Sequence, residues 1–361
     1  MKNKFSILRV STYPTNKHNK VGYHSYKISD QKEINTIFLY PKIDGNIIPP
    51  KNSIDLIELP SLPSYRGSKS LWLYKIIKIN FLIVYKSFRK KIDLVHLHSI
   101  LYLPTAIFFR LKKKRIFLTF HGEDFQYAKR NYLFRLLIKL IDVITVISPD
   151  MIESIKTTTN KEVIYIGNGI EKEIFKDLNL KRNNQIICVA SFKEVKGHSI
   201  LIEAFKKYID SRKKSNLKLV LAGDGELISN IKLLVEKNDL IDKVIFTGNL
   251  TSQELVRIYN KSQYFILTSK REGFPKVILE AISCNCVVIS TKVGAVPNVL
   301  GKDYPFYIDG FNSNAIFNSL ETLTNYDEDL KKANYRNLNL DHNWDKIFKK
   351  YLELYKIKDE N

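Results

Sequence analysis

The sequence predicts an α/β fold with two doubly wound sheets of parallel strands. Short apolar runs of strand length alternate with longer amphipathic segments along most of the chain, which is typical of βαβ units. With 361 residues, the chain is long enough for two domains with separate cores. Asn168-Gly169 and the polar run 181–185 mark the expected crossover between them. We therefore expect domains over residues 1–180 and 181–340, followed by a C-terminal helix in 341–361.

The apolar pattern places the elements along the chain. In the first half we expect strands at 5–10, 36–40, 94–97, 116–120 and 143–147, and helices at 70–90, 100–112, 129–141 and 149–157. In the second half we expect strands at 186–190, 217–222, 244–246, 264–267 and 287–290, and helices at 198–211, 226–238, 252–261 and 276–284. The last helix would carry Trp344, Phe348, Leu352 and Tyr355 on one face and pack back toward the N-terminal domain.

Composition indicates a soluble globular protein, with 44% apolar and 26% charged residues. No window approaches about 18 uninterrupted apolar residues, so a transmembrane helix is not expected. The apolar run near the start is too short for a signal peptide and predicts a first buried strand instead. The cysteines Cys188, Cys284 and Cys286 lie in apolar surroundings without zinc-ligand spacing. We expect them to be reduced core residues of a cytoplasmic protein.

The net charge of +21 is concentrated in the first half of the chain. Residues 66–139 alone carry 17 basic and 3 acidic residues. Such a field attracts anionic lipid headgroups, phosphate-bearing acceptors or nucleic acid. Aromatic, aliphatic and basic residues are mixed at 72–83, 108–115 and 132–140, which favours docking on an anionic membrane surface. The alternative is that these apolar faces pack the core and the lysines are only solvated.

Two glutamates, Glu272 and Glu280, lie eight positions apart around the bend Gly273-Phe274-Pro275. Pro275 suits the first position of a helix, where its missing N–H costs nothing. Glu280 would then fall in the second turn among apolar neighbours, where a carboxylate needs a polar partner. The carboxylates and the N–H groups of the first turn suit a ligand with hydroxyls and an anion, such as a nucleotide-sugar. The alternative is a pair of solvated glutamates, with Glu280 favoured only by its closeness to the helix N-terminus.

Several ready-made motifs are absent from the sequence. No G-x-G-x-x-G follows a strand and no G-x-x-x-x-G-K-[ST] occurs, which argues against a dinucleotide oxidoreductase and a P-loop ATPase. No His/Cys cluster has metal-ligand spacing. The D-x-D at 327–329 lies in a polar helical stretch, and we do not expect it to bind a metal diphosphate.

The segment from Glu272 to Ala281 resembles the E-x7-E motif of the family 4 retaining glycosyltransferases, in the form E-G-F-P-x-V-x-L-E-A. Other segments resemble the same family in the right order. Residues 191–198 are similar to its G-R-L-x-x-x-K-G loop, residues 222–226 to its A-G-x-G turn and residues 247–248 to its base-contacting T-G. Residues 291–297 are similar to its T-x-V-G-G-x-P loop, and residues 168–170 to its hinge N-G-[IV].

The first half resembles the family in fewer places. His121-Gly122-Glu123-Asp124 is similar to the H-G-x-D element, and Gly22 stands where the family has an N-terminal glycine loop. Three departures stand out. Ser191 replaces the family's arginine, Ala295 replaces a glycine, and the N-terminal loop has one glycine instead of two, followed by a short helix.

This resemblance implies a GT-B fold, with two facing Rossmann-like domains that bind the donor mainly on the second and the acceptor on the first. It implies no cofactor and no required metal. Lys196 would grip the donor diphosphate, Glu280 the ribose and Glu272 the sugar hydroxyls, while His121 would orient the donor sugar. The implied site residues are catalytic His121, Glu272 and Lys196; donor-binding Glu280, Gly273, Phe274, Pro275, Lys276, Val277, Gly223, Asp224, Gly248 and Ser191; and acceptor-binding Gly22 and Asp124.

The activity implied is transfer of a sugar from a UDP- or GDP-sugar to a glycan or lipid-linked acceptor in cell-surface polysaccharide synthesis. The enzyme would be cytoplasmic and peripheral at the inner face of the membrane. Two other functions stay open. One is a nucleotide-sugar epimerase or hydrolase of the same fold, and the other is a basic nucleic-acid-binding protein. The latter lacks any recognisable nucleic-acid module, so nucleic acid is not the expected partner. The donor base, the sugar, the acceptor, the oligomeric state and the consequence of Ser191 are left open by the sequence.

Overall fold

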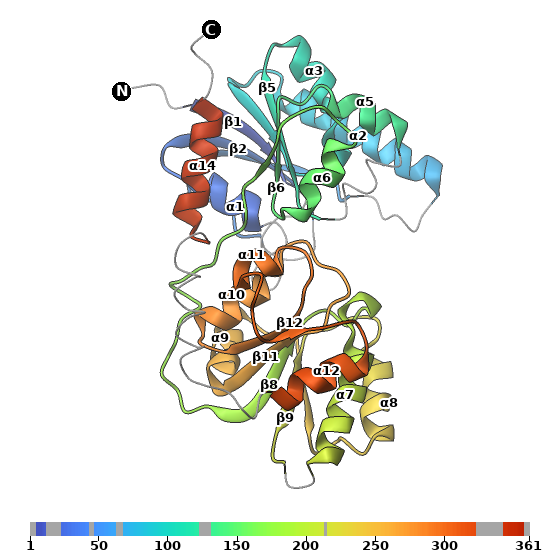
Figure 1. Cartoon of the computed structure of the whole chain (residues 1–361). Coiled ribbons are helices and arrows are strands. Elements are labelled where there is room, and N and C mark those ends of the chain that lie inside the picture. The colour runs from blue at the N-terminus through green and yellow to red at the C-terminus, as the bar shows by residue number, and fades with distance from the viewer. Residues whose placement is uncertain are drawn as a thin grey trace. The chain divides into compact units, whose positions relative to one another are not determined.

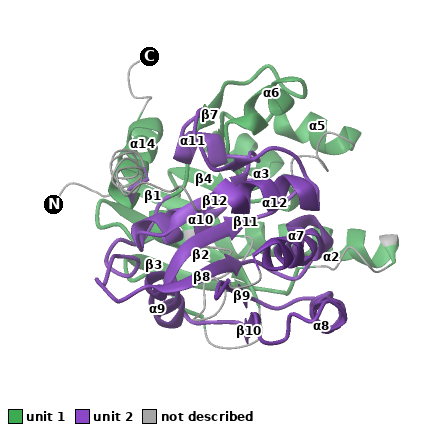
Figure 2. Cartoon of the chain, turned by 60° about the horizontal axis from the view of Figure 1, so that its bottom comes forward, with its two compact units in different colours: residues 1–168, 344–361 green, residues 169–343 purple. Residues whose placement is uncertain are grey.

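The structure is a computed structural model that describes residues 5–11, 23–42, 47–62, 68–122, 131–212, 215–322 and 342–356. The chain divides into two compact units (Figure 2). Unit 1 consists of residues 1–168 together with 344–361, and unit 2 of residues 169–343. Each unit holds one sheet of parallel strands with helices on its faces, so the predicted α/β class is confirmed.

The sheet of unit 1 has seven strands in the order β3-β2-β1-β4-β5-β6-β7 (Figure 1). Its strands are β1 (Phe5–Val10), β2 (Ile34–Pro41), β3 (Ser53–Leu59), β4 (Leu94–Leu97), β5 (Arg115–Phe120), β6 (Val143–Val146) and β7 (Val163–Tyr165). Its helices are α1 (Tyr23–Ser29), α2 (Lys69–Ser87), the 3-10 turn η1 (Ile100–Tyr102), α3 (Thr105–Leu111), α5 (Tyr132–Ile138), α6 (Asp150–Lys156) and α14 (Trp344–Lys356).

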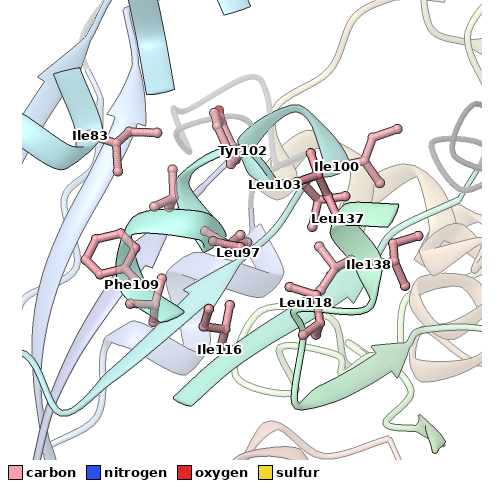
Figure 3. Packing of buried hydrophobic residues seen from close by; sticks show 14 of the residues in the cluster. Ile83, Leu97, Ile100, Tyr102, Leu103, Phe109, Ile116, Leu118, Leu137 and Ile138 are labelled. Atoms are coloured by element: carbon pink, nitrogen blue, oxygen red, sulfur yellow. The ribbon is translucent and has the colours of Figure 1, made fainter. Parts of the chain in front are cut away.

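The two faces of this sheet differ in polarity because side chains alternate along each strand. One face carries Leu8, Val95 and Leu118, which form a single apolar cluster with residues of α2, α3, α5 and α6 (Figure 3). The other face carries polar residues at the alternate positions of the central strands: Arg9, His96, Thr119 and Thr145, all fully buried. These four residues are called the polar row below.

Helix α14 covers the polar row with hydroxyl groups. Tyr351 OH lies 3.1 Å from Thr119 Oγ1 and 3.1 Å from His24 Nε2, and Tyr355 OH lies 2.8 Å from His96 Nδ1. The buried face of α14 was predicted only in part, since Tyr351 is buried whereas Leu352 is partly exposed. The reason is that the sheet beneath offers polar partners, which a purely apolar helix face could not satisfy.

The sheet of unit 2 has six parallel strands in the order β10-β9-β8-β11-β12-β13. Its strands are β8 (Asn183–Val189), β9 (Lys218–Ala222), β10 (Val244–Gly248), β11 (Ser262–Leu267), β12 (Val287–Thr291) and β13 (Tyr307–Ile308). Its helices are η2 (Glu194–Lys196), α7 (His198–Ser211), α8 (Ile228–Lys237), α9 (Ser252–Lys261), α10 (Lys276–Ser283), α11 (Val296–Leu300) and α12 (Ser313–Glu321). Helices α7, α8 and α12 lie together, as do α9, α10 and α11 (Figure 1).

Some elements escaped the sequence analysis for identifiable reasons. The edge strand β3 exposes alternate residues and carries Asp55 and Glu58, so it lacks the continuous apolar run used to find strands. Strand β13 has two residues, and α1, α11 and α12 are short. The helix expected over 100–112 is split, because Pro104 separates η1 from α3.

All three cysteines are buried thiols, as predicted for core residues. Burial raises the pKa of the Cys188 thiol to about 12, so it is protonated and unreactive at neutral pH. Among the helices of the described segments, none combines the length and apolar character needed to cross a membrane.

Candidate active site

The carboxyl ends of the strands of unit 2 bring most of the predicted donor-binding residues to one edge of the sheet. The loop after β8 carries Ser191 and Lys196, and the turn after β9 carries Gly223 and Asp224. Gly248 ends β10, and its carbonyl accepts a hydrogen bond of 2.9 Å from the N–H of Gly223. The loop after β11 carries Glu272 and leads into α10.

The centre of this edge is an ion pair between Lys196 and Glu272. Lys196 Nζ donates to Glu272 Oε1 at 2.6 Å, and Ser269 Oγ donates to the same carboxylate oxygen at 2.6 Å. Only 21% of the lysine side chain and 12% of the glutamate side chain are exposed. Sequence analysis gave these two residues separate roles toward a ligand, and the structure shows that they first bind each other.

Backbone contacts hold the two loops of this pair together. Thr268 Oγ1 donates to the carbonyl of Lys196 at 2.9 Å, and the N–H of Lys270 donates to the carbonyl of Val195 at 2.8 Å. Gly197 has a φ of 71°, and a Cβ there would lie 2.4 Å from the carbonyl oxygen of Thr268. Only glycine allows this close approach, so the K-G dipeptide fixes the position of the lysine.

A third loop packs on Glu272 through Gly294. This glycine has a φ of 53°, and a Cβ on it would lie 2.5 Å from the carbonyl oxygen of Glu272 and 2.4 Å from that of Gly273. The N–H of Ala295 donates to the Gly273 carbonyl at 2.9 Å. The replacement of the family's second glycine by Ala295 is accommodated because this residue has a negative φ of −78°.

Glu280 lies in the second turn of α10 and is partly buried. Tyr259 OH, from α9, donates to Glu280 Oε2 at 3.2 Å. Tyr259 is fully buried, and burial together with the Glu280 charge raises the pKa of its hydroxyl well above the usual value. Tyr259 is thus a polar partner for the carboxylate, which sequence analysis missed because it lies 21 positions away on another helix.

Helix α10 begins at Lys276, where the predicted helix 276–284 begins, and Pro275 precedes it as the N-cap instead of taking the first helical position, because its ψ of 94° is extended. No described side chain caps this helix start. Lys276 and Val277, in the first turn, are partly buried, whereas Phe274 is buried and its ring lies 5.5 Å from that of His342. Because Phe274 is buried, we infer that it helps to fix the conformation of the loop that leads into α10.

The remaining predicted donor residues lie nearer the surface. Ser191 is partly buried, and its carbonyl accepts from the N–H of Lys193 at 2.8 Å. Asp224 is exposed, and its Oδ1 accepts from the N–H of Gly225 at 2.7 Å. Its carboxylate therefore orders the glycine turn whether or not it also meets a ligand.

His198 directly follows the lysine loop and was not singled out by sequence analysis. Its ring stacks on that of Phe192 with centroids 4.3 Å apart, and it is 4% exposed. Neither ring nitrogen has a hydrogen-bond partner among the described residues. Burial, with a smaller contribution from the Lys196 charge, lowers the pKa of His198 to about 4, so the ring is neutral at pH 7.

In unit 1, His121 directly follows β5 and meets a second histidine. His98 Nδ1 and His121 Nε2 lie 3.0 Å apart, and the rings stack with centroids 5.2 Å apart. His98 follows β4, the parallel neighbour of β5, so their carboxyl ends place the two rings together. Sequence analysis missed His98, although the alternation His96-Leu97-His98 was the available signal. Gly22 and Asp124 lie outside the described residues.

Burial also controls the charge of the histidines next to His121. Desolvation lowers the pKa values of His96 and His98 well below the usual value, and the positive charge of Arg9 and the neighbouring imidazoles act in the same direction. Both rings are therefore neutral at pH 7. No group of three or more His, Cys, Asp or Glu side chains in the described part of the chain has an arrangement suited to a metal ion.

The two parallel sheets and the loops at their carboxyl ends define a glycosyltransferase of the GT-B class. The chain is similar in structure to sucrose-phosphate synthase from Thermosynechococcus elongatus, with a TM-score of 0.79 and 18% identity over 98% of each chain. The model for Glycosyltransferase Family 4 matches residues 38–174, and that for Glycosyl transferases group 1 matches residues 170–339. The chain belongs to the family 4 glycosyltransferases.

Curated relatives agree with this assignment. A glycosyltransferase of Methanocaldococcus jannaschii is 30% identical over 70% of this chain and 68% of its own length. The N-acetyl-alpha-D-glucosaminyl L-malate synthase of Bacillus anthracis is 27% identical over 59% of this chain and 60% of its own length. A Campylobacter jejuni N-acetylgalactosaminyltransferase named for a diphospho-undecaprenol acceptor is 28% identical over 52% of this chain and 50% of its own length. The chain thus spans about half to two thirds of these relatives.

The buried neutral His198 predicts a pH-dependent stability. Below pH 6.5 the unfolded chain takes up a proton at this ring, whereas the folded chain does so only near pH 4, so stability falls as the pH drops between these values. His198→Phe should remove about 2 kcal/mol of this loss between pH 7.5 and pH 5.0. Urea unfolding followed by circular dichroism at both pH values measures it. Ser199→Ala, an exposed change in the same turn, should follow the wild type. Equal pH dependence in all three proteins would contradict the prediction.

Proposed function

We propose that this glycosyltransferase moves a sugar from a nucleotide-sugar, a UDP- or GDP-sugar, to a glycan or lipid-linked acceptor in cell-surface polysaccharide synthesis, with retention of anomeric configuration. The observation that carries the proposal is the ion pair Lys196–Glu272, which lies on the loops that end β8 and β11 and is followed by the uncapped start of α10. This arrangement offers a cation and helix N–H groups to an anion, beside carboxylates for hydroxyl groups.

The donor diphosphate would compete with Glu272 for Lys196. When the diphosphate binds, the lysine turns from the carboxylate to the phosphate oxygens, and the start of α10 adds further stabilisation of the negative charge. Glu272 is then released to accept hydrogen bonds from the hydroxyls of the sugar. Because Lys196 and the helix start stabilise the departing diphosphate, the reaction needs no metal ion in this proposal.

Glu280, in unit 2, and His121, in unit 1, have further roles toward the donor in this proposal. Glu280 keeps one oxygen on Tyr259 and would accept a ribose hydroxyl with its remaining lone pairs. His121 would orient the donor sugar by hydrogen bonding, because its ring is held by His98. We assign Glu272 no nucleophilic role in this proposal: its Oε1 accepts hydrogen bonds from Lys196 and Ser269, and it would accept hydrogen bonds from the sugar hydroxyls in the same way.

The acceptor would reach the enzyme at a membrane surface, as helix α2 suggests. Its residues Ile76, Ile79 and Ile83 are buried in the core of unit 1. A second apolar stripe on the same helix and its C-cap points away from the core and is 58–70% exposed, and we name it the α2 stripe: Tyr74, Ile77, Phe81, Tyr85 and Phe88.

Basic residues flank the α2 stripe. Lys78 Nζ lies 6.0 Å from the centre of the Tyr74 ring, and Lys112 Nζ lies 5.4 Å from that of Phe88. Exposed aromatic and aliphatic side chains beside lysines are typical of a helix that lies in the headgroup region of an anionic bilayer. Core packing therefore explains the buried face of α2. It does not explain the exposed α2 stripe, which is available to a binding partner. In this proposal the partner is an anionic bilayer at the inner face of the membrane, which carries the lipid-linked acceptor.

Two assays test the function. A thermal-shift panel of UDP, GDP and ADP with their sugars identifies the donor, because a ligand that binds only the native state raises its melting temperature. Incubation of the labelled donor with lipid-linked acceptor and EDTA then separates transfer from epimerisation or hydrolysis. Labelled sugar in the lipid fraction supports the proposal. Donor turnover that needs no acceptor favours the epimerase or hydrolase, and oligonucleotide binding without any nucleotide-sugar effect favours the nucleic-acid-binding protein.

Glu280→Ala should abolish the thermal shift produced by the true donor, because the ribose hydroxyls lose their acceptor. The matched control is Glu236→Ala, an exposed glutamate on α8 of the same unit, which should respond like the wild type. An unchanged response of Glu280→Ala would show that the ribose binds elsewhere.

Glu272→Gln should bind the free nucleoside diphosphate about three- to tenfold more tightly, because the partly buried lysine no longer has to leave a carboxylate. Its transfer rate should nevertheless fall, since the neutral amide accepts sugar hydroxyls more weakly. Lys196→Ala should weaken diphosphate binding and leave the affinity for the nucleoside unchanged. Calorimetric titration measures the affinities, and transfer of labelled sugar to the acceptor measures the rate. A Glu272→Gln enzyme that binds the diphosphate no better than wild type would refute the competition.

The double change Phe81→Ser and Tyr85→Ser should lower co-sedimentation with phosphatidylglycerol vesicles about tenfold or more, because each exposed aromatic ring contributes apolar area to the bilayer contact. Vesicles of phosphatidylcholine should bind weakly in every case, since the lysines then lack anionic headgroups. Leu233→Ser, an exposed apolar residue on α8, is the matched control. Equal binding of the double variant and the wild type would exclude the α2 stripe as the docking surface.

A further inference from the structure

Arg9 is a fully buried cation whose hydrogen bonds all go to neutral groups within the described residues. One terminal nitrogen, NH1, lies 2.8 Å from His96 Nδ1, 3.4 Å from His98 Nε2 and 3.2 Å from Tyr355 OH. The other, NH2, donates to the carbonyl of Ile28 at 3.4 Å. A buried charge without an opposite charge is costly, so its presence at the centre of the sheet calls for an explanation.

The guanidinium fixes the proton positions on the two histidines that it contacts. Arginine is always protonated and has no lone pair to offer, so it can only donate. NH1 has two hydrogens for its three neighbours, but a ring N–H directed at the cation would be unfavourable, so His96 Nδ1 and His98 Nε2 are both the unprotonated nitrogens of their rings. Since both rings are neutral, His96 carries its proton on Nε2 and donates it to Thr119 Oγ1 at 2.7 Å. His98 carries its proton on Nδ1.

The same argument extends one residue further, to His121. His98 Nδ1–H faces His121 Nε2 at 3.0 Å, so this nitrogen of His121 must accept the bond and cannot carry a proton. The proton of a neutral His121 ring then sits on Nδ1. The reverse arrangement would place two N–H groups against each other, either between His121 and His98 or between His98 and Arg9.

We propose that Arg9 is a positioning residue which acts through His98 to fix the proton of His121 on Nδ1, so that the Nδ1–H group is the one this ring offers to a sugar hydroxyl. The use of His121 toward the donor rests on the proposed function, whereas the tautomer does not. Arg9, on β1, is paired in register with His96 on β4, and His121 follows the next strand, β5. The chain of bonds therefore crosses three adjacent strands on rigid elements.

The surroundings of these rings oppose a second proton on any of them. Among the described residues, the Arg9 cation and the His24 ring face them, and the His24 ring lies 5.3 Å from His121 and 6.2 Å from His98, centroid to centroid. From α14, the hydroxyls of Tyr351 and Tyr355 reach His24 and His96. A charged His121 would have to give up the bond from His98 and lie near a fixed positive charge. The ring is thus preset as a neutral hydrogen-bond donor.

The first test is nuclear magnetic resonance of the full-length protein with 15N-labelled histidine, which reports directly on the protonation of each ring nitrogen. Single replacements of the seven histidines assign the signals. At pH 7 wild-type His121 and His98 should both show Nδ1–H, and His96 should show Nε2–H. A wild-type His121 with its proton on Nε2 would overturn the proposal without any variant or activity assay.

Variants then test whether Arg9, and not one of its neighbours, fixes the tautomer of His121. Arg9→Met removes the hydrogen-bond donor at this position, and His121 should become a mixture of tautomers. Arg9→Lys keeps a cationic donor and should keep the Nδ1–H form. Tyr355→Phe, the matched control, removes another hydrogen bond of Arg9 and leaves the contact with His98 intact, so the tautomer should not change. Should Arg9→Met not fold, His98→Leu breaks the same chain one residue later and has the same expected result.

Kinetics give the functional readout once the donor is known. Arg9→Met and His98→Leu should lower kcat about tenfold, the effect of one misdirected hydrogen bond, with a smaller change in the KM for the donor. Arg9→Lys should recover most of the loss. A unique Nδ1–H tautomer of His121 that survives Arg9→Met, or equal rates in Arg9→Met and wild type, would refute the proposal. Absence of any transferase activity would contradict only the proposed function, because the tautomers are measured without substrate.

Discussion

The donor edge of unit 2 depends on the ion pair between Lys196 and Glu272. These residues lie 76 positions apart, on loops after two neighbouring strands, and each would be a partly buried charge without the other. Gly197 and Gly294 let the two loops and a third one approach closely enough for the pair to form. In the proposed reaction, a phosphate ligand would therefore meet a lysine that is already in place and a helix start that follows the Glu272 loop.

Unit 1 uses a buried charge in a different way. Its sheet has an apolar face, packed by α2, α3, α5 and α6, and a polar row beneath α14. Burying a polar row requires a partner for nearly every donor and acceptor, and Tyr351 and Tyr355 of the last helix supply them. Residues from both ends of the chain thus complete one face of one sheet. The buried Arg9 can only donate hydrogen bonds, and it thereby sets the direction of the hydrogen bonds along this row.

The sequence predicted those parts of the structure that depend on local pattern. Strands at the centre of each sheet are short and mostly apolar, and most of them were placed within a few residues, as were α7 and α9. The family motifs indicated Lys196, Glu272 and Glu280. The partners of Glu280 and His121 were out of reach of these motifs, because Tyr259 and His98 come from other elements. Strand β3 was missed because an edge strand exposes every second residue.

The two units therefore use buried polarity for different purposes. In unit 2 the charge of Lys196 is balanced by Glu272, so the balance can change when a ligand with a stronger negative charge arrives. In unit 1 the charge of Arg9 is surrounded, within the described residues, by neutral groups, so the proton positions cannot change without turning an N–H group toward the buried cation. A transferase needs both kinds of site. The leaving group must be bound by groups that can change their partners when it binds. The sugar must be oriented by a hydrogen-bond donor whose direction is set before the sugar arrives.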